Sequence, residues 1–116
     1  MNWSPLQTLE QLQSITAESK EKPVLIFKHS RTCSISRATL DRLERNWKDE
    51  TGAKLYFLDL LTYREISNRI ASDFGVVHES PQVLIIKDGK SVFDRSHFAI
   101  EYPAIASTLQ TLSTKN

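Results

Sequence analysis

Two short runs of β-branched and aromatic residues constrain the fold of this chain more than any other feature. The first run is Val24–Phe27 and the second is Lys54–Leu60. Both suit strands that are buried on two faces, and a stretch with helical spacing at 32–49 separates them. Strands joined through a helix pair in parallel by a crossover connection. The sequence therefore predicts an α/β protein whose first two strands run parallel.

Four stretches have the apolar spacing of helices. The first begins at Ser4–Pro5, because proline at the first helical position loses no hydrogen bond. The third begins at the capping box Thr62–Glu65 and ends at Gly75. The fourth follows Pro103. In chain order the four stripes are Leu6, Leu9, Leu12 and Ile15; Ser36, Leu40, Leu43 and Trp47; Ile66, Ile70 and Phe74; and Ile105, Leu109 and Leu112.

A two-residue turn, Asp88–Gly89, joins the last two predicted strands, Gln82–Lys87 and Lys90–Arg95, into an antiparallel hairpin. The element order is then α-β-α-β-α-β-β-α. The simplest closure is a four-stranded mixed sheet flanked by helices on both faces. A chain of 116 residues fits a single domain spanning 1–116, because two domains would each fall below ordinary domain size.

The composition excludes several classes of partner. The net charge is only +1, whereas a general nucleic-acid binder usually carries a larger basic excess or a basic run. No apolar run approaches the roughly twenty residues of a membrane span. We therefore expect a cytoplasmic protein, a monomer or weak dimer, with neither nucleic acid nor membrane as a partner.

The chain has one cysteine, Cys33, which excludes an internal disulfide, a dithiol couple and a cysteine-based zinc cluster. Cys33 stands at the start of the predicted helix 32–49. The first turn of a helix offers unpaired N–H groups and the positive end of the helix dipole, and both favour a thiolate. We interpret Cys33 as a nucleophile, the alternative being a small buried hydrophobic residue.

Basic residues crowd the sequence around this thiol. They stabilise a thiolate as a group and attract an anionic partner, although each taken alone is also consistent with a solvated charge. The residues are Lys28, His29, Arg31 and Arg37. We assign Lys28, His29 and Arg31 to substrate binding, and His29 is also a candidate proton carrier.

Ser36 follows Cys33 by three residues, so the motif has the form C-x-x-S, with Thr32 and Ser34 flanking the cysteine. A serine cannot act as the resolving thiol of a C-x-x-C protein. Its hydroxyl either donates a hydrogen bond to the Cys33 thiolate across one helical turn or bonds a backbone carbonyl. We place Thr32, Ser34 and Ser36 with Cys33 in the catalytic loop.

Ser80–Pro81 precedes the third predicted strand, where proline is permitted. A cis bond there would turn the loop tightly and place the Ser80 backbone opposite Cys33, ready to pair with an extended substrate, whereas the base rate favours a trans bond. We assign Ser80 and Pro81 to substrate binding. His78 lies in the same loop. A metal site of Cys33, His29 and His78 lacks a compact ligand spacing, so we expect no bound metal.

Together, the cysteine at a helix start, the Ser-Pro before the third strand and the Asp-Gly hairpin resemble the thioredoxin fold. More closely, the segment 29–36 (His-Ser-Arg-Thr-Cys-Ser-Ile-Ser) resembles the monothiol bacilliredoxin family, whose usual signature is Thr-Cys-Pro-Ile-Ser. The chain departs from that signature at Ser34, where the family has proline. Ser34 keeps an N–H group that proline lacks, which bears on the choice of small thiol.

The resemblance implies that Cys33 is the nucleophile and that Pro81 is cis. It also implies an enzyme that removes bacillithiol or a similar small thiol from S-thiolated proteins, with that thiol as co-substrate and no permanently bound cofactor. Two alternatives stay open: a thioredoxin-fold binding module without turnover, and an iron–sulfur carrier like the monothiol glutaredoxins, whose motif is Cys-Gly-Phe-Ser.

Overall fold

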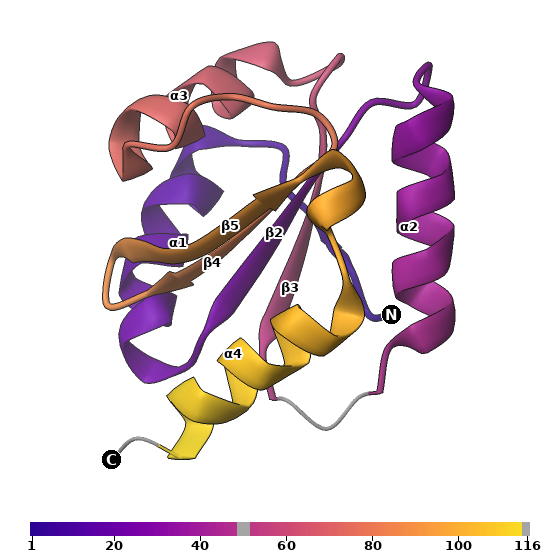
Figure 1. The fold of residues 1–116 in the computed structure, drawn as a ribbon. Coiled ribbons are helices and arrows are strands. Elements are labelled where there is room, and N and C mark those ends of the chain that lie inside the picture. The colour runs from indigo at the N-terminus through magenta and orange to yellow at the C-terminus, as the bar shows by residue number, and fades with distance from the viewer. Residues whose placement is uncertain (49–51, 115–116) are drawn as a thin grey trace.

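The structure is a computed structural model that describes residues 1–48 and 52–114. A five-stranded sheet in the order β1-β3-β2-β4-β5 lies between two layers of helices (Figure 1). The elements are β1 (Ser4–Pro5), α1 (Leu9–Glu21), β2 (Val24–His29), α2 (Ser34–Asn46), β3 (Lys54–Asp59), α3 (Arg64–Phe74), β4 (Gln82–Lys87), β5 (Lys90–Ser96), the 3-10 turn η1 (His97–Ala99) and α4 (Tyr102–Thr114). The predicted α/β class and thioredoxin-like arrangement are confirmed, with one strand more than expected.

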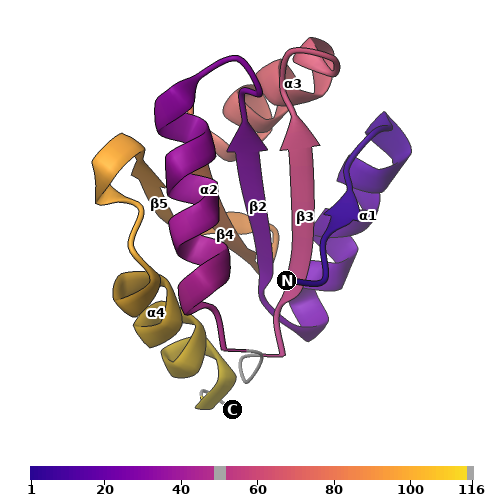
Figure 2. The same ribbon diagram turned by 90° about the vertical axis from the view of Figure 1, so that its right-hand side faces the viewer.

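The central strand β2 organises the sheet. It pairs in parallel with β3 and antiparallel with β4, and all six of its side chains are buried. Because side chains alternate across a strand, Leu25 and Phe27 point to one core and Val24 and Ile26 to the other. Helices α2 and α4 cover the first face, and α1 and α3 cover the second (Figure 2).

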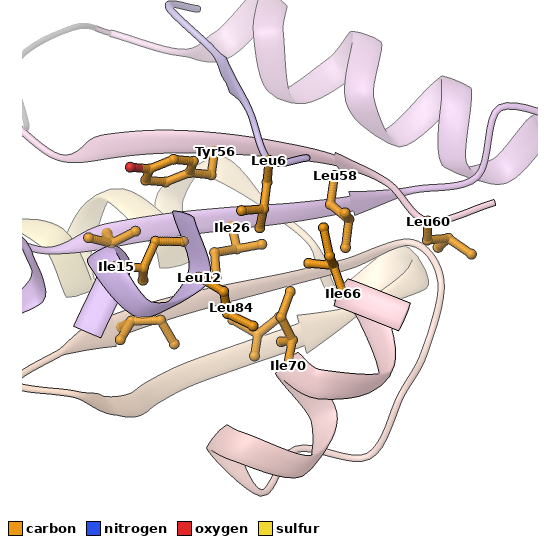
Figure 3. Close-up of a cluster of buried hydrophobic side chains, with 12 residues drawn as sticks. Leu6, Leu12, Ile15, Ile26, Tyr56, Leu58, Leu60, Ile66, Ile70 and Leu84 are labelled. Carbon is orange, nitrogen blue, oxygen red and sulfur yellow. The ribbon is translucent and has the colours of Figure 1, made fainter. Parts of the chain in front are cut away.

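The core under α1 and α3 is built from aliphatic side chains and Tyr56, which come from both helices, three strands and adjoining residues (Figure 3). Ile15 from α1 and Ile70 from α3 are fully buried, and they pack in the same cluster as Ile26 and Leu84 of the sheet. On the other face, Leu43 of α2 and Ile105 of α4 pack with the strands. The predicted helical stripes therefore face the sheet.

The chain start differs from the prediction. Ser4–Pro5 is not the start of a helix but the short strand β1, which pairs in parallel with β3. Helix α1 begins at Leu9, after Thr8. The Thr8 hydroxyl accepts the Gln11 backbone N–H, and the Gln11 side chain accepts the Thr8 backbone N–H. This capping box, rather than Pro5, sets the helix start.

Two further boundaries also differ. The first strand was predicted over Val24–Phe27, whereas β2 continues through Lys28 and His29, which are buried. Helix α2 spans Ser34–Asn46, shorter than the predicted range of 32–49, whose last residue lies outside the described residues. Strand β2 is longer than predicted because both polar side chains find partners elsewhere in the fold.

The predicted capping box at Thr62 is wrong. Helix α3 begins after Tyr63, which makes no side-chain cap, and the Thr62 hydroxyl instead donates a hydrogen bond to Asp59 at 2.9 Å. The end of the helix is as predicted: Gly75 adopts the left-handed conformation with φ +65, as is usual after a helix.

The hairpin at Asp88–Gly89 is confirmed, with positive φ at both residues, as its tight turn requires. The turn is fastened to α1, because Ser19 accepts the N–H of Asp88 through its carbonyl oxygen and the N–H of Gly89 through its hydroxyl. After β5 the chain makes η1, which the sequence did not predict. In the described part of the chain no helix has the length and apolarity needed to span a membrane.

We predict that Gly89→Ala lowers the free energy of unfolding by more than Gly75→Ala does. Both glycines have positive φ, which costs a non-glycine residue about 1–2 kcal/mol. An added Cβ at Gly89 would also lie 3.3 Å from Thr16 Cγ2, whereas none of the described atoms lies within 4 Å of one at Gly75. Urea denaturation of the two variants measures the difference. Equal losses would contradict the close packing of the hairpin on α1.

Candidate active site

The candidate site lies at one end of the sheet, where β2 ends and β4 begins. Lys28 pairs with Gln82 in the last register pair of these strands. Cys33 follows β2 by four residues, and Pro81 immediately precedes β4. Both are thus carried to the same end of the sheet. The Ser80–Pro81 peptide bond is cis, as the resemblance implied, and Pro81 is buried.

Cys33 sits at the junction of a tight turn and a helix. Its backbone N–H donates to the Ser30 carbonyl oxygen at 3.1 Å, which closes the turn, and its carbonyl oxygen accepts the Arg37 N–H at 3.1 Å. Cys33 is thus the N-cap residue of α2, and its side chain makes no capping hydrogen bond. The partly exposed thiol stands at the positive end of the helix dipole, which stabilises negative charge.

Ser36 is fully buried. We predicted a hydrogen bond from its hydroxyl to the Cys33 thiolate, and the structure has other partners for this hydroxyl. The Ser36 Oγ lies 2.8 Å from His29 Nδ1 and accepts the Ser30 backbone N–H at 3.2 Å. The alternative of a bond to a backbone carbonyl is also wrong, because the backbone partner is an amide. Among the described residues no hydrogen bond joins Ser36 to Cys33. Ser36 instead fixes the turn that precedes Cys33 and the imidazole of His29.

His29 presents a largely buried imidazole to Ser36. Its ring packs beside Phe27 and Phe57 with centroids 6.1 and 5.3 Å away. Burial lowers the pKa of His29 and is the largest cause; the charge of Arg37 acts in the same direction, while Asp59 and Glu44 oppose it. The neutral imidazole can share a hydrogen bond with the Ser36 hydroxyl. Only 8% of His29 is exposed, so little of its ring is available for the substrate contact that we predicted.

Arg31 is not a free cation beside the thiol. Its Nη1 lies 3.0 and 2.9 Å from the two carboxylate oxygens of Asp59 and donates to Thr62 Oγ1 at 3.1 Å. Burial acts to raise the pKa of Asp59, but hydrogen bonds from Thr62 and the charge of Arg31 outweigh it and lower that pKa. Asp59 is distant in sequence and was missed. Asp59 could have been predicted as a partner from its position near the carboxyl end of the predicted strand 54–60, which runs parallel to the strand before Arg31.

Lys28 does not lie in the substrate loop, contrary to our prediction. It follows Val24 and Ile26 on the face of β2 that α1 and α3 cover, and it is fully buried. Its Nζ lies 3.4 Å from the Ser67 carbonyl oxygen and 3.3 Å from His78 Nδ1. Lys28 and His78 thus belong to one cluster under α3, whereas His29 contacts α2.

The remaining predicted residues of the loop are exposed. Thr32 and Ser34 lie on either side of Cys33, and Arg37 lies one helical turn after it. Thr32 Oγ1 is 3.4 Å from the Ser30 hydroxyl. The basic cluster expected from the sequence is therefore divided, because Arg31 is paired, Lys28 is buried on the other face, and Arg37 is left at the surface near the thiol.

Large apolar side chains are exposed around the same end of the molecule. Ile35 lies in the first turn of α2, Val77 lies in the loop before Pro81, and Phe98 lies in η1; they are 39%, 81% and 70% exposed. Helix α2 contacts η1, and the His97 N–H donates to the Pro81 carbonyl oxygen at 3.0 Å. Sequence reasoning missed these residues, since single apolar residues outside a periodic pattern give no signal.

Comparison with known proteins identifies the family. Residues 4–105 match the family described as monothiol bacilliredoxin BrxC. The chain belongs to the monothiol bacilliredoxin family. The predicted resemblance is thereby confirmed over most of the chain. Membership of this family supports a thiol redox role, and Cys33 is the single cysteine of the sequence.

Solved structures agree with this membership. A thioredoxin-fold protein described as an oxidoreductase is 30% identical, with a TM-score of 0.79, and the match covers 90% of this bacilliredoxin and 91% of that chain. The thioredoxin of Fasciola hepatica is 19% identical, with a TM-score of 0.68 and coverages of 93% and 97%. A variant thioredoxin of Halobacterium salinarum is 17% identical, with a TM-score of 0.73 and coverages of 98% and 93%. The last two show the shared fold alone.

We predict that Ser36→Ala destabilises this bacilliredoxin by about 1–3 kcal/mol, because it leaves the Ser30 N–H and the His29 Nδ1 buried without a partner. Ser34→Ala is the matched control, since Ser34 is exposed in the same helical turn and should change stability by no more than about 0.5 kcal/mol. Urea denaturation measures both. A loss of the same size in the two variants would contradict the buried role of Ser36.

Proposed function

We propose that this protein is a thiol-disulfide oxidoreductase that removes bacillithiol or a similar low-molecular-weight thiol from S-thiolated proteins through Cys33. The observation that carries the proposal is the position of Cys33, a partly exposed thiol at the start of α2 and at the same end of the sheet as cis-Pro81. Membership of the monothiol bacilliredoxin family supports the choice of chemistry.

In the first step the Cys33 thiolate attacks the bacillithiol sulfur of a protein–bacillithiol mixed disulfide. The bond between the two substrate sulfurs breaks, the protein thiolate leaves and takes up a proton, and a Cys33–bacillithiol disulfide forms. The dipole of α2 stabilises the Cys33 thiolate both as attacking and as leaving group.

In the second step a free bacillithiol thiolate attacks the bacillithiol sulfur of the Cys33 adduct. Bacillithiol disulfide leaves, and the Cys33 thiolate is regenerated. The external thiol is needed because Ser36 stands where a resolving cysteine would stand, and its hydroxyl is committed to His29 and Ser30. Bacillithiol thus acts as a co-substrate, and no permanently bound cofactor takes part.

The surface around Cys33 suits both substrates. The exposed Arg37 supplies a positive charge for the carboxylates of the small thiol. Ile35, Val77 and Phe98 offer apolar contacts to the thiolated protein. Ser80 is partly exposed beside cis-Pro81, so its backbone can pair with an extended substrate segment. Reducing conditions such as those of the cytoplasm keep the single thiol free.

The same apolar surface favours a second candidate function, a binding module without turnover. In that case the protein partner docks on Ile35, Val77 and Phe98, and Cys33 is a passive thiol. Turnover separates the two functions, because only the oxidoreductase releases bacillithiol and only the oxidoreductase needs the sulfur of Cys33.

We predict that the wild-type protein, supplied with free bacillithiol, releases labelled bacillithiol from an S-thiolated protein, and that Cys33→Ala and Cys33→Ser do not. The label is followed by chromatography at neutral pH. Ser34→Ala is the control variant, because it changes the residue next to Cys33 and keeps the thiol. Release by Cys33→Ala at the wild-type rate would contradict the oxidoreductase, and unchanged binding of the protein by the same variant would then support the module.

A further inference from the structure

Lys28 is an unusual residue for the interior of a small sheet. Among the described residues it is the only lysine, arginine, aspartate or glutamate that is buried, and its exposure is 0%. No carboxylate of the described residues forms an ion pair with it. Burial of an ammonium group without a counter-charge is costly, and an apolar side chain of similar size is usually tolerated as well or better. A lysine here therefore calls for a reason other than stability.

The contacts of Lys28 point to the loop that carries cis-Pro81. Its ammonium group bridges the Ser67 carbonyl oxygen of α3 and the Nδ1 atom of His78. His78 stands two residues before Ser80, and the Ser67 hydroxyl lies 3.3 Å from the same Nδ1. Because an ammonium group can only donate, Nδ1 must carry a lone pair, and the His78 proton is on Nε2.

The loop is held at two further places. The Gln82 side-chain amide donates to the Val77 carbonyl oxygen at 3.0 Å, and the His97 N–H donates to the Pro81 carbonyl oxygen at 3.0 Å. Lys28 also pairs with Gln82 across the strands, and it reaches the loop at His78, which lies between Val77 and Pro81 in the sequence. The contact with His78 links the loop to β2, the strand that leads to Cys33.

We propose that Lys28 is a positioning residue, which holds the 76–81 loop through His78 and so sets the place of cis-Pro81 relative to Cys33. The proposal rests on the proposed function, in which the Ser80–Pro81 loop contacts the substrate. Lys28 touches no reacting atom in this account. Its effect passes through His78 to the loop.

The charges around His78 make this hold dependent on pH. Burial is the largest cause that lowers the pKa of His78; the charges of Lys28 and Arg64 lower it further, and Glu79 opposes them. Burial lowers the pKa of Lys28 to about 8, so the ammonium form prevails at neutral pH. As the pH falls below about 6.5, the ordinary pKa of histidine, His78 takes up a proton at Nδ1. The charged imidazole then no longer accepts a hydrogen bond from the Lys28 ammonium group and repels it instead.

The test compares Lys28→Met with Lys87→Met in the full-length protein. Lys87 is also a strand lysine that donates to backbone carbonyls, but it lies at the other end of β4. For Lys28→Met we expect unchanged or higher resistance to urea and faster exchange of the His97 amide hydrogen. We also expect bacillithiol release to fall roughly tenfold or more at pH 7.5, since small displacements of positioned groups cost rate steeply. Lys87→Met should keep the wild-type rate and His97 exchange.

The contact with His78 is tested by two further variants. His78→Leu removes the acceptor and should reproduce the Lys28→Met defect, whereas His78→Asn keeps a side-chain acceptor and should restore most of the rate. In the His78→Leu background, Lys28→Met should have no further effect. The ratio of wild-type to Lys28→Met rates should also decline towards one as the pH falls below about 6.5. A purely structural lysine would produce neither the rescue nor the change in this ratio.

The outcomes separate this proposal from the proposed function. An active wild type, together with a Lys28→Met variant that keeps both the wild-type rate and the His97 protection, overturns the positioning role of Lys28. An inactive wild type counts against the oxidoreductase, and the exchange of the His97 amide then still decides whether Lys28 holds the loop. If Lys28→Met fails to fold, the contrast between His78→Leu and His78→Asn decides the same question.

Discussion

The pairing of β2 with its two neighbours is the constraint on which the rest of this structure depends. Its parallel register with β3 and antiparallel register with β4 bury all six of its side chains. The alternation of side chains then sends His29 towards α2 and Lys28 towards α3. The strand ends directly before the turn that holds Cys33. A slip by one residue would exchange the two faces, separating His29 from Ser36 and Lys28 from His78.

Buried polar contacts on both faces of β2 thus support one exposed thiol. On one face, the neutral imidazole of His29 and the hydroxyl of Ser36 fix the turn through the Ser30 N–H. On the other face, the Lys28 ammonium group reaches the loop before cis-Pro81. Buried polar groups of this kind are costly unless they are satisfied. These groups are concentrated at one end of the sheet, where they position the turn before Cys33 and the loop before cis-Pro81 at a cost in stability.

The elements with strong local patterns were predictable from the sequence. The strand Gln82–Lys87, the Asp88–Gly89 turn and the end of α3 at Gly75 follow from periodicity and turn chemistry, and the structure has them as predicted. The two-residue strand β1 has no period to detect, and it exists because β3 offers a free edge. Pro5 was misread as a helix start, although the Thr8–Gln11 capping box was present in the sequence.

The candidate site was predictable only in part, because its polar contacts join residues far apart in the chain. Cys33 at a helix start could be located from the motif alone. That Lys28 is buried depends on Ser67 and His78, and that Arg31 is paired depends on Asp59. Such partners are set by the packing of α3 on the sheet. The sequence therefore suggested one basic cluster around Cys33, whereas in the structure Arg31 is paired, Lys28 is buried and Arg37 is exposed.

The most direct test of the central claim is the intact mass of the protein after incubation with bacillithiol disulfide and, in parallel, with glutathione disulfide. We expect one bacillithiol adduct on the wild-type chain, located on Cys33 and absent from Cys33→Ala, with much slower formation of the glutathione adduct. No bacillithiol adduct on the wild-type chain would contradict the assignment of Cys33 as a thiol-exchange nucleophile, and equal labelling by the two disulfides would contradict a preference for bacillithiol.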